Sequence, residues 1–177
     1  MTRNPLILVT LALGLVLGGC SNRSIGNKID DQFLEPNVAN AISRSHPDLT
    51  GPTSHIVVTA YNGVILLAGQ TPRADLKDKA AQVANGVQGV KKLHNELQVL
   101  QPTSALARSN DALITSKIKT LMLADSKVPS AKVKVVTENG IVYLMGLVTR
   151  AEGAAATNVA SGASGVQKIV TLYQYTN

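Results

Sequence analysis

The fold of this 177-residue chain is decided by the stretch Ile56-Val57-Val58-Thr59-Ala60-Tyr61-Asn62-Gly63-Val64-Ile65-Leu66-Leu67-Ala68-Gly69. Two apolar, β-branched runs are joined in it by Asn-Gly, a pair that readily adopts the positive φ angles of a tight hairpin turn. The stretch therefore predicts a β-hairpin. The pattern returns 77 residues later, as Val133-Lys134-Val135-Val136-Thr137-Glu138-Asn139-Gly140-Ile141-Val142-Tyr143-Leu144-Met145-Gly146.

The repeat continues on both sides of the hairpin. Downstream, at a shift of 76 residues, the segment 83–90 matches the segment 159–166. Upstream, Val38 and Ile42 match Ile114 and Ile118 at the same shift. Apolar residues four positions apart predict a helix before each hairpin, and alanine-rich segments predict a second helix after it. A Gly-Val pair then ends that helix and begins a third strand, so each unit has the order αββαβ.

Local signals place the ends of these helices. Asp111 is a candidate N-cap for the first helix of the second unit. Thr71-Pro72 opens the second helix of the first unit, with proline at the first helical position. Thr149-Arg150-Ala151-Glu152 is a capping box for the second helix of the second unit.

The predicted fold class is α+β, with two tandem αββαβ domains. Each domain is a three-stranded sheet covered on one face by two helices. We predict a first domain over residues 37–100, a linker over 101–109 and a second domain over 110–177. Residues 20–36 are polar, show no clear period and are predicted to be a tether.

The first nineteen residues have the pattern of an export signal. Arg3 precedes an apolar run from Leu6 to Leu17 that is shorter than the roughly 20 residues needed to span a bilayer. Leu17-Gly18-Gly19-Cys20 is similar to a bacterial lipobox, in which the cysteine carries acyl chains. Cys20 is the single cysteine, so no intramolecular disulfide uses it. Ser21 follows instead of the aspartate that retains many lipoproteins at the inner membrane, which favours a lipid anchor on the periplasmic face of the outer membrane.

The charge distribution favours a membrane partner. The formal net charge is +6, and a basic exported protein meets anionic lipid headgroups. Residues 37–100 hold six Lys or Arg and four Asp or Glu, whereas residues 101–177 hold eight and four. The chain has no tryptophan and one phenylalanine, so a base-stacking surface is poorly supported and no nucleic acid partner is expected.

No pattern in the sequence predicts catalysis, a metal site or a cofactor. His46, His55 and His94 have no spacing typical of a ligand set. The segment Ser161-Gly162-Ala163-Ser164-Gly165 is neither a G-x-S-x-G nucleophile elbow nor followed by a Walker lysine. We therefore expect a protein that is not an enzyme.

The Asn-Gly hairpin, the glycine that closes its second strand and the Gly-Val before the last strand resemble the BON domain. The stretches most similar to that family are 58–61, 66–70, Asn110-Asp111 and 137–149. Two such domains behind a lipobox are similar to the dual-BON outer-membrane lipoproteins. The resemblance implies a phospholipid-binding protein that supports envelope integrity, often at the division site. It also implies that the first helix of the second domain contacts anionic lipid, such as phosphatidylglycerol or cardiolipin.

The first helix of the second unit contains the residue pattern that such a contact needs. Its inward stripe is predicted to be Ile114, Ile118, Leu121 and Met122. Leucines exposed beside lysines suit a helix lying at a membrane surface, where apolar tips enter the acyl region and ammonium groups meet phosphates. The candidate lipid-binding residues are Leu113, Ser116, Lys117, Lys119, Thr120 and Leu123, together with Val159 and Ser164 near the end of the second helix.

The first unit lacks this pattern at the shift of 76. The equivalents of Leu113, Lys117, Lys119 and Leu123 are then Asn37, Ala41, Ser43 and Pro47. The comparison favours the second unit as the one that contacts lipid.

Two alternatives stay open at this point. Leu113 and Leu123 could pack on the linker or on the first unit, leaving Lys117 and Lys119 as an ordinary solvated face. The BON-like surfaces could instead bind an outer-membrane assembly component or another envelope protein, with lipid contact incidental.

Overall fold

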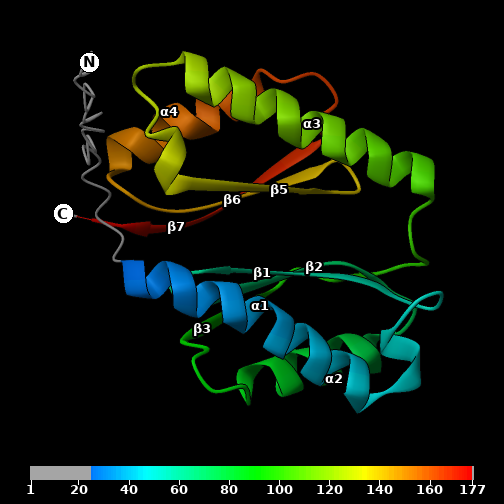
Figure 1. The fold of residues 1–177 in the computed structure, drawn as a ribbon. Coiled ribbons are helices and arrows are strands. Elements are labelled where there is room, and N and C mark those ends of the chain that lie inside the picture. Colours follow the sequence, from blue (N-terminus) through cyan, green and yellow to red (C-terminus); the bar gives the residue numbers. More distant parts are fainter. Residues whose placement is uncertain (1–24, 177) are drawn as a thin grey trace, which may run out of the picture.

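The computed structural model describes residues 25–176, with side chains from residue 30 onward. The predicted signal peptide (1–19) and Cys20 lie outside these residues. The described chain forms two αββαβ units, and their sheets face each other at the centre with the helices on the two outer sides (Figure 1). The α+β prediction with two repeated units is confirmed.

The first unit contains two helices and one mixed sheet. Its elements are α1 (Ile25–Ser45), η1 (Pro47–Leu49), β1 (His55–Tyr61), β2 (Val64–Thr71), α2 (Ala74–Asn85), β3 (Lys92–Asn95) and β4 (Gln98–Val99). β1 pairs antiparallel with β2, while β3 and β4 pair parallel with β2. The predicted third strand is thus divided in two, and Leu97 between the halves is buried in the core of the unit.

The second unit repeats this topology with an uninterrupted third strand. Its elements are α3 (Ala105–Ala124), η2 (Ser130–Lys132), β5 (Val133–Glu138), β6 (Ile141–Val148), α4 (Arg150–Ser161) and β7 (Lys168–Tyr175). β5 pairs antiparallel with β6, and β7 pairs parallel with β6. The parallel third strand follows from the helix that connects it to the hairpin, as in any βαβ crossover.

Both predicted hairpins are present, and their turns use Asn-Gly as expected. The φ angles are 54° and 79° at Asn62 and Gly63, and 51° and 73° at Asn139 and Gly140. The glycine that closes the second strand has a separate role. A Cβ at Gly69 would lie 2.0 Å from the carbonyl oxygen of His55, so only glycine allows β1 and β2 to approach this closely.

The two sheets pack against each other through their helix-free faces. In β2, Ile65 and Leu67 contribute to the core under α1 and α2, whereas Leu66 between them contributes to a separate cluster that joins the two units. The buried members of this interface cluster are Tyr61, Val64, Leu66, Ala68, Tyr143, Met145 and Leu172. All eight residues of β2 are buried because the strand is covered on both faces.

Polar contacts across the interface are reciprocal. The Asn62 side-chain amide donates to Oε1 of Gln174 at 3.0 Å, and the Asn139 amide donates to Oε1 of Gln98 at 3.1 Å. In each direction, therefore, the turn asparagine of one unit donates a hydrogen bond to a glutamine on the third strand of the other unit. This reciprocity relates the units by an approximate two-fold axis, which Figure 1 views nearly end-on.

A second matched pair of positions has diverged. The Tyr61 hydroxyl donates to the backbone carbonyl of Lys132 at 2.8 Å. The equivalent positions in the other direction are Glu138 and His55, whose Oε1 and Nε2 atoms are 3.4 Å apart. One neutral hydrogen bond is thus matched by a carboxylate–imidazole contact, and the Glu138 side chain is buried.

The first domain begins earlier than the sequence analysis placed it. α1 starts at Ile25, and Asp31 and Leu34 are buried, so residues 25–36 of the predicted tether belong to the domain. The correction has a physical cause. The carboxylate of Asp31 accepts hydrogen bonds from the backbone amides of Asn62 at 2.6 Å and Gly63 at 2.8 Å, so a residue that looks like part of a solvated tether holds the hairpin turn.

Two other helix ends differ from prediction and one agrees. α3 begins at Ala105 with Ser104 as its N-cap, so half of the predicted linker is helical and Asp111 lies inside the helix instead of capping it. α2 begins at Ala74, so Pro72 precedes the helix. The capping box of α4 is confirmed, with Thr149 and Glu152 bonded reciprocally.

We predict that Leu66→Ala lowers the free energy of unfolding by about 2–5 kcal/mol, because it leaves a cavity in the interface cluster. The measurement is urea unfolding followed by circular dichroism. Leu100→Ala, at a position that is 49% exposed, is the matched control and should change stability by less than about 0.5 kcal/mol. Equal effects of the two substitutions would show that the sheets do not pack in solution.

A pH dependence is expected from Glu138. Burial raises the pKa of its carboxyl, and the nearby charge of Asp111 acts in the same direction while His55 opposes it. A raised folded-state pKa stabilises the fold below the unfolded pKa of about 4.3, and this contribution is lost as the pH rises through the folded value. The stability of the wild type relative to Glu138→Gln should therefore fall as the pH is raised from about 4. Urea unfolding at a series of pH values tests this, and a relative stability that rises would show that attraction to His55 dominates.

Candidate functional site

The rotation of α3 about its own axis is fixed by its buried side. Asp111, Ile114, Ile118 and Met122 are buried in the second unit. The Asp111 carboxylate accepts hydrogen bonds from the backbone amides of Asn139 at 2.8 Å and of Gly140, so it ties the middle of the helix to the hairpin turn. These contacts determine which side of α3 faces solvent.

The opposite side of α3 exposes three leucines, which we call the leucine face. Leu106 is 81% exposed, Leu113 69% and Leu123 75%. At 100° per residue they fall within an arc of roughly 100°, and they extend over roughly 26 Å of helix. Three exposed leucines along one helix face form an apolar strip that the fold itself leaves uncovered.

This exposure decides one question that the sequence left open. Leu113 and Leu123 do not pack on the linker or on the first unit, because both side chains are largely solvent-exposed. The alternative in which they stabilise the fold is therefore excluded.

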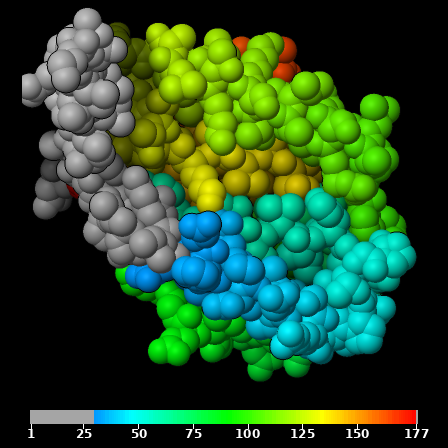
Figure 2. All heavy atoms as spheres, viewed as in Figure 1, coloured from blue at the N-terminus to red at the C-terminus, as the bar shows by residue number. Residues whose placement is uncertain are grey.

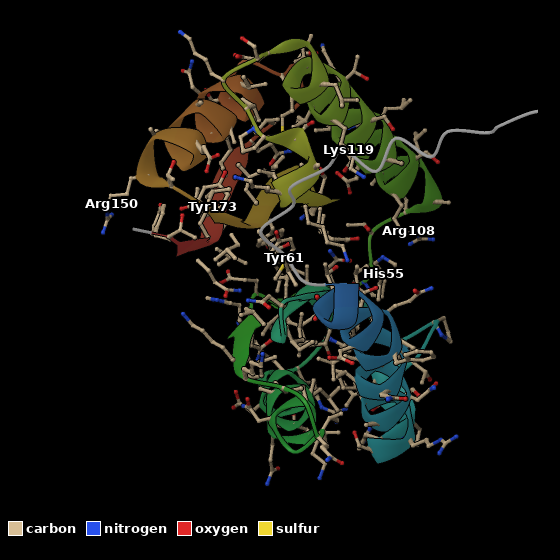
Figure 3. All side chains as sticks on the ribbon, turned by 60° about the vertical axis from the view of Figure 1, so that its left-hand side comes forward. His55, Tyr61, Arg108, Lys119, Arg150 and Tyr173 are labelled. Carbon is tan, nitrogen blue, oxygen red and sulfur yellow. The ribbon has the colours of Figure 1, made fainter. Side chains whose placement is uncertain are left out.

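Cationic side chains flank the leucine face on both sides. Lys117 is exposed and donates a hydrogen bond to the Ser164 hydroxyl. Lys119 is exposed on the other flank, and Arg108 lies on the same helix near its start (Figure 3). Within the described side chains, neither Lys117 nor Lys119 forms an ion pair, so both charges are available to an anion.

The remaining predicted site residues divide into two groups. Ser116 and Thr120 lie between the leucines and are exposed, with the Thr120 hydroxyl donating to the carbonyl of Ser116. Ser164 is brought to the site by its bond with Lys117. Val159 does not lie at the site. It is half-buried, packs against the core of the second unit and lines a hollow with Leu121.

Sequence reasoning missed Leu106 and Arg108. Both lie in the first turn of α3, which the prediction assigned to the linker. Leu106 is seven residues before Leu113, a spacing that keeps both side chains on one helix face, so the periodic signal was present. Ser104, whose hydroxyl accepts from the amide of Ala107, is the N-cap that marks this earlier start.

The first unit must be compared at a different shift. Residues 31–40 and 111–120 have the same order of buried and exposed positions, and Asp31 and Asp111 both hold a hairpin turn. The helices therefore align at a shift of 80, one turn from the predicted 76. At this shift the equivalents of Leu113, Lys117, Lys119 and Leu123 are Phe33, Asn37, Ala39 and Ser43.

The corrected alignment changes one conclusion and strengthens another. Phe33 gives the first unit an exposed apolar residue where the second has Leu113, so the pattern is not entirely absent. The flanking lysines are still absent, because Asn37 and Ala39 replace them. With its true start, the region 30–100 holds six Lys or Arg against seven Asp or Glu, whereas residues 101–177 hold eight against four.

Each of the three histidines has surroundings of its own. His46 caps the short helix η1 by accepting from the amide of Asp48, and His55 contacts Glu138 across the interface. Burial lowers the pKa of His94, which is half-buried on β3. Among the described residues, no group of three potential metal ligands comes together. Within the same part of the chain, no helix combines the length and apolarity that crossing a bilayer requires.

Comparison with protein families finds the BON domain twice in this chain, over residues 30–101 and 110–177. Both matches agree with the observed units, and the first starts within α1 instead of at residue 37. The chain is 35% identical to the outer membrane lipoprotein DolP of Haemophilus influenzae, over 99% of each chain.

Two further relatives cover most of the chain. It is 37% identical to the 21 kDa hemolysin of Actinobacillus pleuropneumoniae, over 86% of this chain and 78% of that protein. It is 32% identical to the osmotically-inducible protein Y of Escherichia coli, over 84% and 74%. Among solved structures, the C-terminal domain of CdsD, the structural protein of the type III secretion system of Chlamydia trachomatis, matches with a TM-score of 0.33 and 11% identity, over 81% of this chain and 98% of that one.

We predict that Asp111→Ala lowers the free energy of unfolding by about 2–3 kcal/mol, because two backbone amides lose a charged acceptor. Asp78→Ala, which removes an exposed carboxylate on α2, is the control and should be close to neutral. Thermal unfolding followed by circular dichroism measures both. A neutral Asp111→Ala would mean that the carboxylate does not hold α3 on the hairpin.

Proposed function

The chain belongs to the BON domain family, and from this premise we propose that its second domain binds anionic phospholipid through the outer side of α3. The protein is a lipoprotein of the outer membrane, anchored on the periplasmic face, as its similarity to DolP over nearly the full chain indicates. We assign the lipid anchor to Cys20. The protein would then contact the membrane twice, through the acyl chains on Cys20 and through α3.

The observation that carries this proposal is the leucine face with a lysine on each flank. At a membrane surface the leucine tips would enter the acyl boundary while Lys117 and Lys119 meet lipid phosphates. Partial burial of three leucines contributes roughly 3 kcal/mol, about half of their full transfer energy. Each lysine adds about 1 kcal/mol near an anionic surface. The sum, roughly 5 kcal/mol, corresponds to a sub-millimolar Kd.

A contact of this affinity is too weak to hold the protein on the membrane, but it is strong enough to favour one lipid composition over another. Acyl chains contribute about 0.8 kcal/mol per buried methylene, and two or more of them hold a protein stably. A tethered domain samples the surface at an effective concentration in about the millimolar range, at which a weak contact is substantially occupied. We therefore assign attachment to the anchor and the choice of phosphatidylglycerol- or cardiolipin-rich regions to α3.

The proposed cellular role follows from these two separate contacts, the acyl anchor and α3. A protein that settles on anionic lipid in the outer membrane can support envelope integrity, including at the division site, by occupying those regions. We propose no catalysis, because the relatives are BON-domain proteins and the histidines and carboxylates described above serve the fold. Binding of an outer-membrane assembly or other envelope protein stays an alternative that the next experiment addresses.

We predict that Lys117→Glu weakens binding of the acyl-free chain, residues 21–177, to phosphatidylglycerol vesicles by about 30-fold, since it reverses one charge at the surface. Leu113→Asp should weaken it by at least about tenfold, because a carboxylate replaces an inserting side chain. Vesicle co-sedimentation at low and high salt measures both effects.

Matched controls come from the first domain. Lys92→Glu reverses an exposed charge on β3, and Leu100→Asp changes an exposed leucine outside α3, so both should bind like the wild type. If Lys117→Glu and Leu113→Asp also bind like the wild type, α3 is not the lipid contact. If these two variants still bind an outer-membrane assembly or other envelope protein, the result would favour the alternative in which the protein binds a protein partner.

A further inference from the structure

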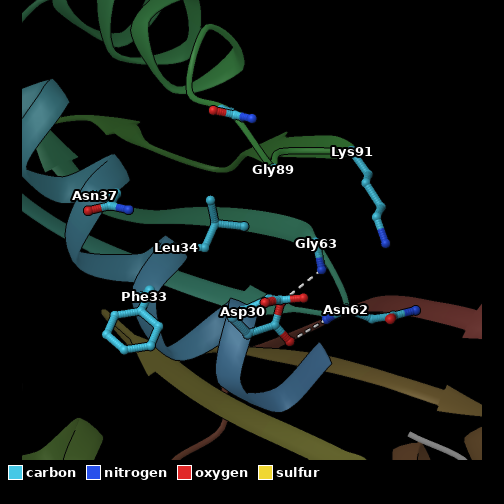
Figure 4. Close-up of a pocket in the computed structure, with 10 residues that line it drawn as sticks. Asp30, Phe33, Leu34, Asn37, Asn62, Gly63, Gly89 and Lys91 are labelled. Atoms are coloured by element: carbon cyan, nitrogen blue, oxygen red, sulfur yellow. Dashed lines mark hydrogen bonds between the residues drawn. The ribbon is translucent and has the colours of Figure 1, made fainter. Parts of the chain in front are cut away.

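Phe33 is the one phenylalanine of the chain, and the fold leaves it in solvent. Its side chain is 65% exposed on α1, close to the 69% of Leu113 on α3. Its neighbour Leu34 is buried in the core of the first domain, so the two side chains leave α1 in different directions (Figure 4). Exposing a large aromatic side chain stabilises nothing in the fold, which raises the question of what covers it.

The approximate two-fold axis places Phe33 and Leu113 at matched positions. Rotation about an axis does not change height along it, so equivalent residues lie at the same height. α1 and α3 both lie on the side of the molecule that faces the viewer along this axis (Figure 2). A flat surface perpendicular to the axis therefore lies at about the same distance from Leu113 and from Phe33, and a bilayer across this side of the molecule faces both helices.

The position of the anchor favours this orientation. Four residues lie between Cys20 and Ile25, where α1 begins, and a chain of five residue steps reaches at most about 18 Å in any conformation. Phe33 is eight residues further along the helix, or roughly 12 Å. An acyl-anchored Cys20 thus keeps the start of α1, and Phe33 with it, near the bilayer.

The surroundings of Phe33 hold no excess of positive charge. A hollow of about 290 Å³ beside it is lined by polar and charged groups, among them Asp30, Asn37 and Lys91 (Figure 4). A second carboxylate, Asp31, also lines the hollow, so two acids outnumber the one lysine, and Asn37 stands where the second domain has Lys117. The first domain therefore lacks the cations that would attract anionic lipid, while a phenylalanine ring suits the headgroup level of any phospholipid.

We propose that the bilayer is contacted by both domains, with Phe33 of α1 inserting at the headgroup level of the leaflet that α3 binds. The proposal rests on the lipid-binding function of α3 and extends it to the first domain. The two contacts differ in kind. The α3 contact depends on anionic lipid and weakens with salt, whereas the Phe33 contact depends on neither.

Tryptophan fluorescence can test this, because the chain has no tryptophan of its own. The lipidated full-length protein, reconstituted in phosphatidylethanolamine–phosphatidylglycerol vesicles, is compared as three single variants. Phe33→Trp reports on α1, Leu113→Trp on α3, and Gln82→Trp on an exposed position of α2 as the control. We expect the first two to shift to shorter wavelength and to be quenched by lipids brominated near the headgroup, and the third to do neither.

The outcomes separate the two proposals. Quenching at 113 without quenching at 33 overturns the Phe33 contact and leaves the function of α3 standing, whereas quenching at neither position overturns both. A shift at 33 that needs added envelope protein, and not lipid, would make Phe33 part of a protein-docking surface and also overturns the proposal.

A second variant guards against a perturbed helix. Phe33→Asp should weaken vesicle binding of the acyl-free chain by about fivefold at high salt, where the added charge is screened, because an inserting ring is lost. Gln32→Asp, which adds the same charge at the preceding exposed position, should have less than half of that effect. Circular dichroism shows whether both variants are folded. Equal effects of the two substitutions would assign the loss to charge and overturn an inserting ring.

Discussion

The packing of one sheet on the other is the contact on which the rest of the structure depends. Each unit has two helices, which cover one face of its sheet and leave the other face apolar. Leu66, Tyr143 and Met145 would be exposed in a separated unit and are buried where the sheets meet. A unit of this size has a small core of its own, so the shared cluster acts as a third core for the pair.

Face-to-face packing also decides what the helices can do. Since the sheets occupy the centre, the helices α1, α2, α3 and α4 lie outside, and the approximate two-fold axis brings α1 and α3 to one side of the molecule. The positions that the axis relates have diverged. Lys117 and Lys119 on α3 correspond to Asn37 and Ala39 on α1, so a duplicated architecture presents a basic helix face and a neutral one to the same side.

Local pattern was sufficient for much of the fold and part of the site. The Asn-Gly turns, the apolar strands that they join and the capping box at Thr149 are fixed by neighbours in sequence, and all three are present. The start of α1 was not predictable in this way, and the start of α3 was missed although Ser104 and Leu106 indicate it. In the sequence, Asp31 and Asp111 look like solvated or capping residues. In the structure, both carboxylates are buried and accept hydrogen bonds from a hairpin turn about 30 positions further along the chain. The shift between the two first helices was misjudged for the same reason.

The sequence by itself determined the repeat, the order of elements in each unit and the amphipathic character of α3. These are encoded in spacings of two and of three to four residues, which report on one element at a time. Only the tertiary structure decided which surface covers each apolar face. Leu66 and Leu113 are both leucines in predicted elements, yet the first is buried against the other sheet and the second faces solvent. The difference is made by the partner across the fold, and a spacing along the chain holds no information about that partner.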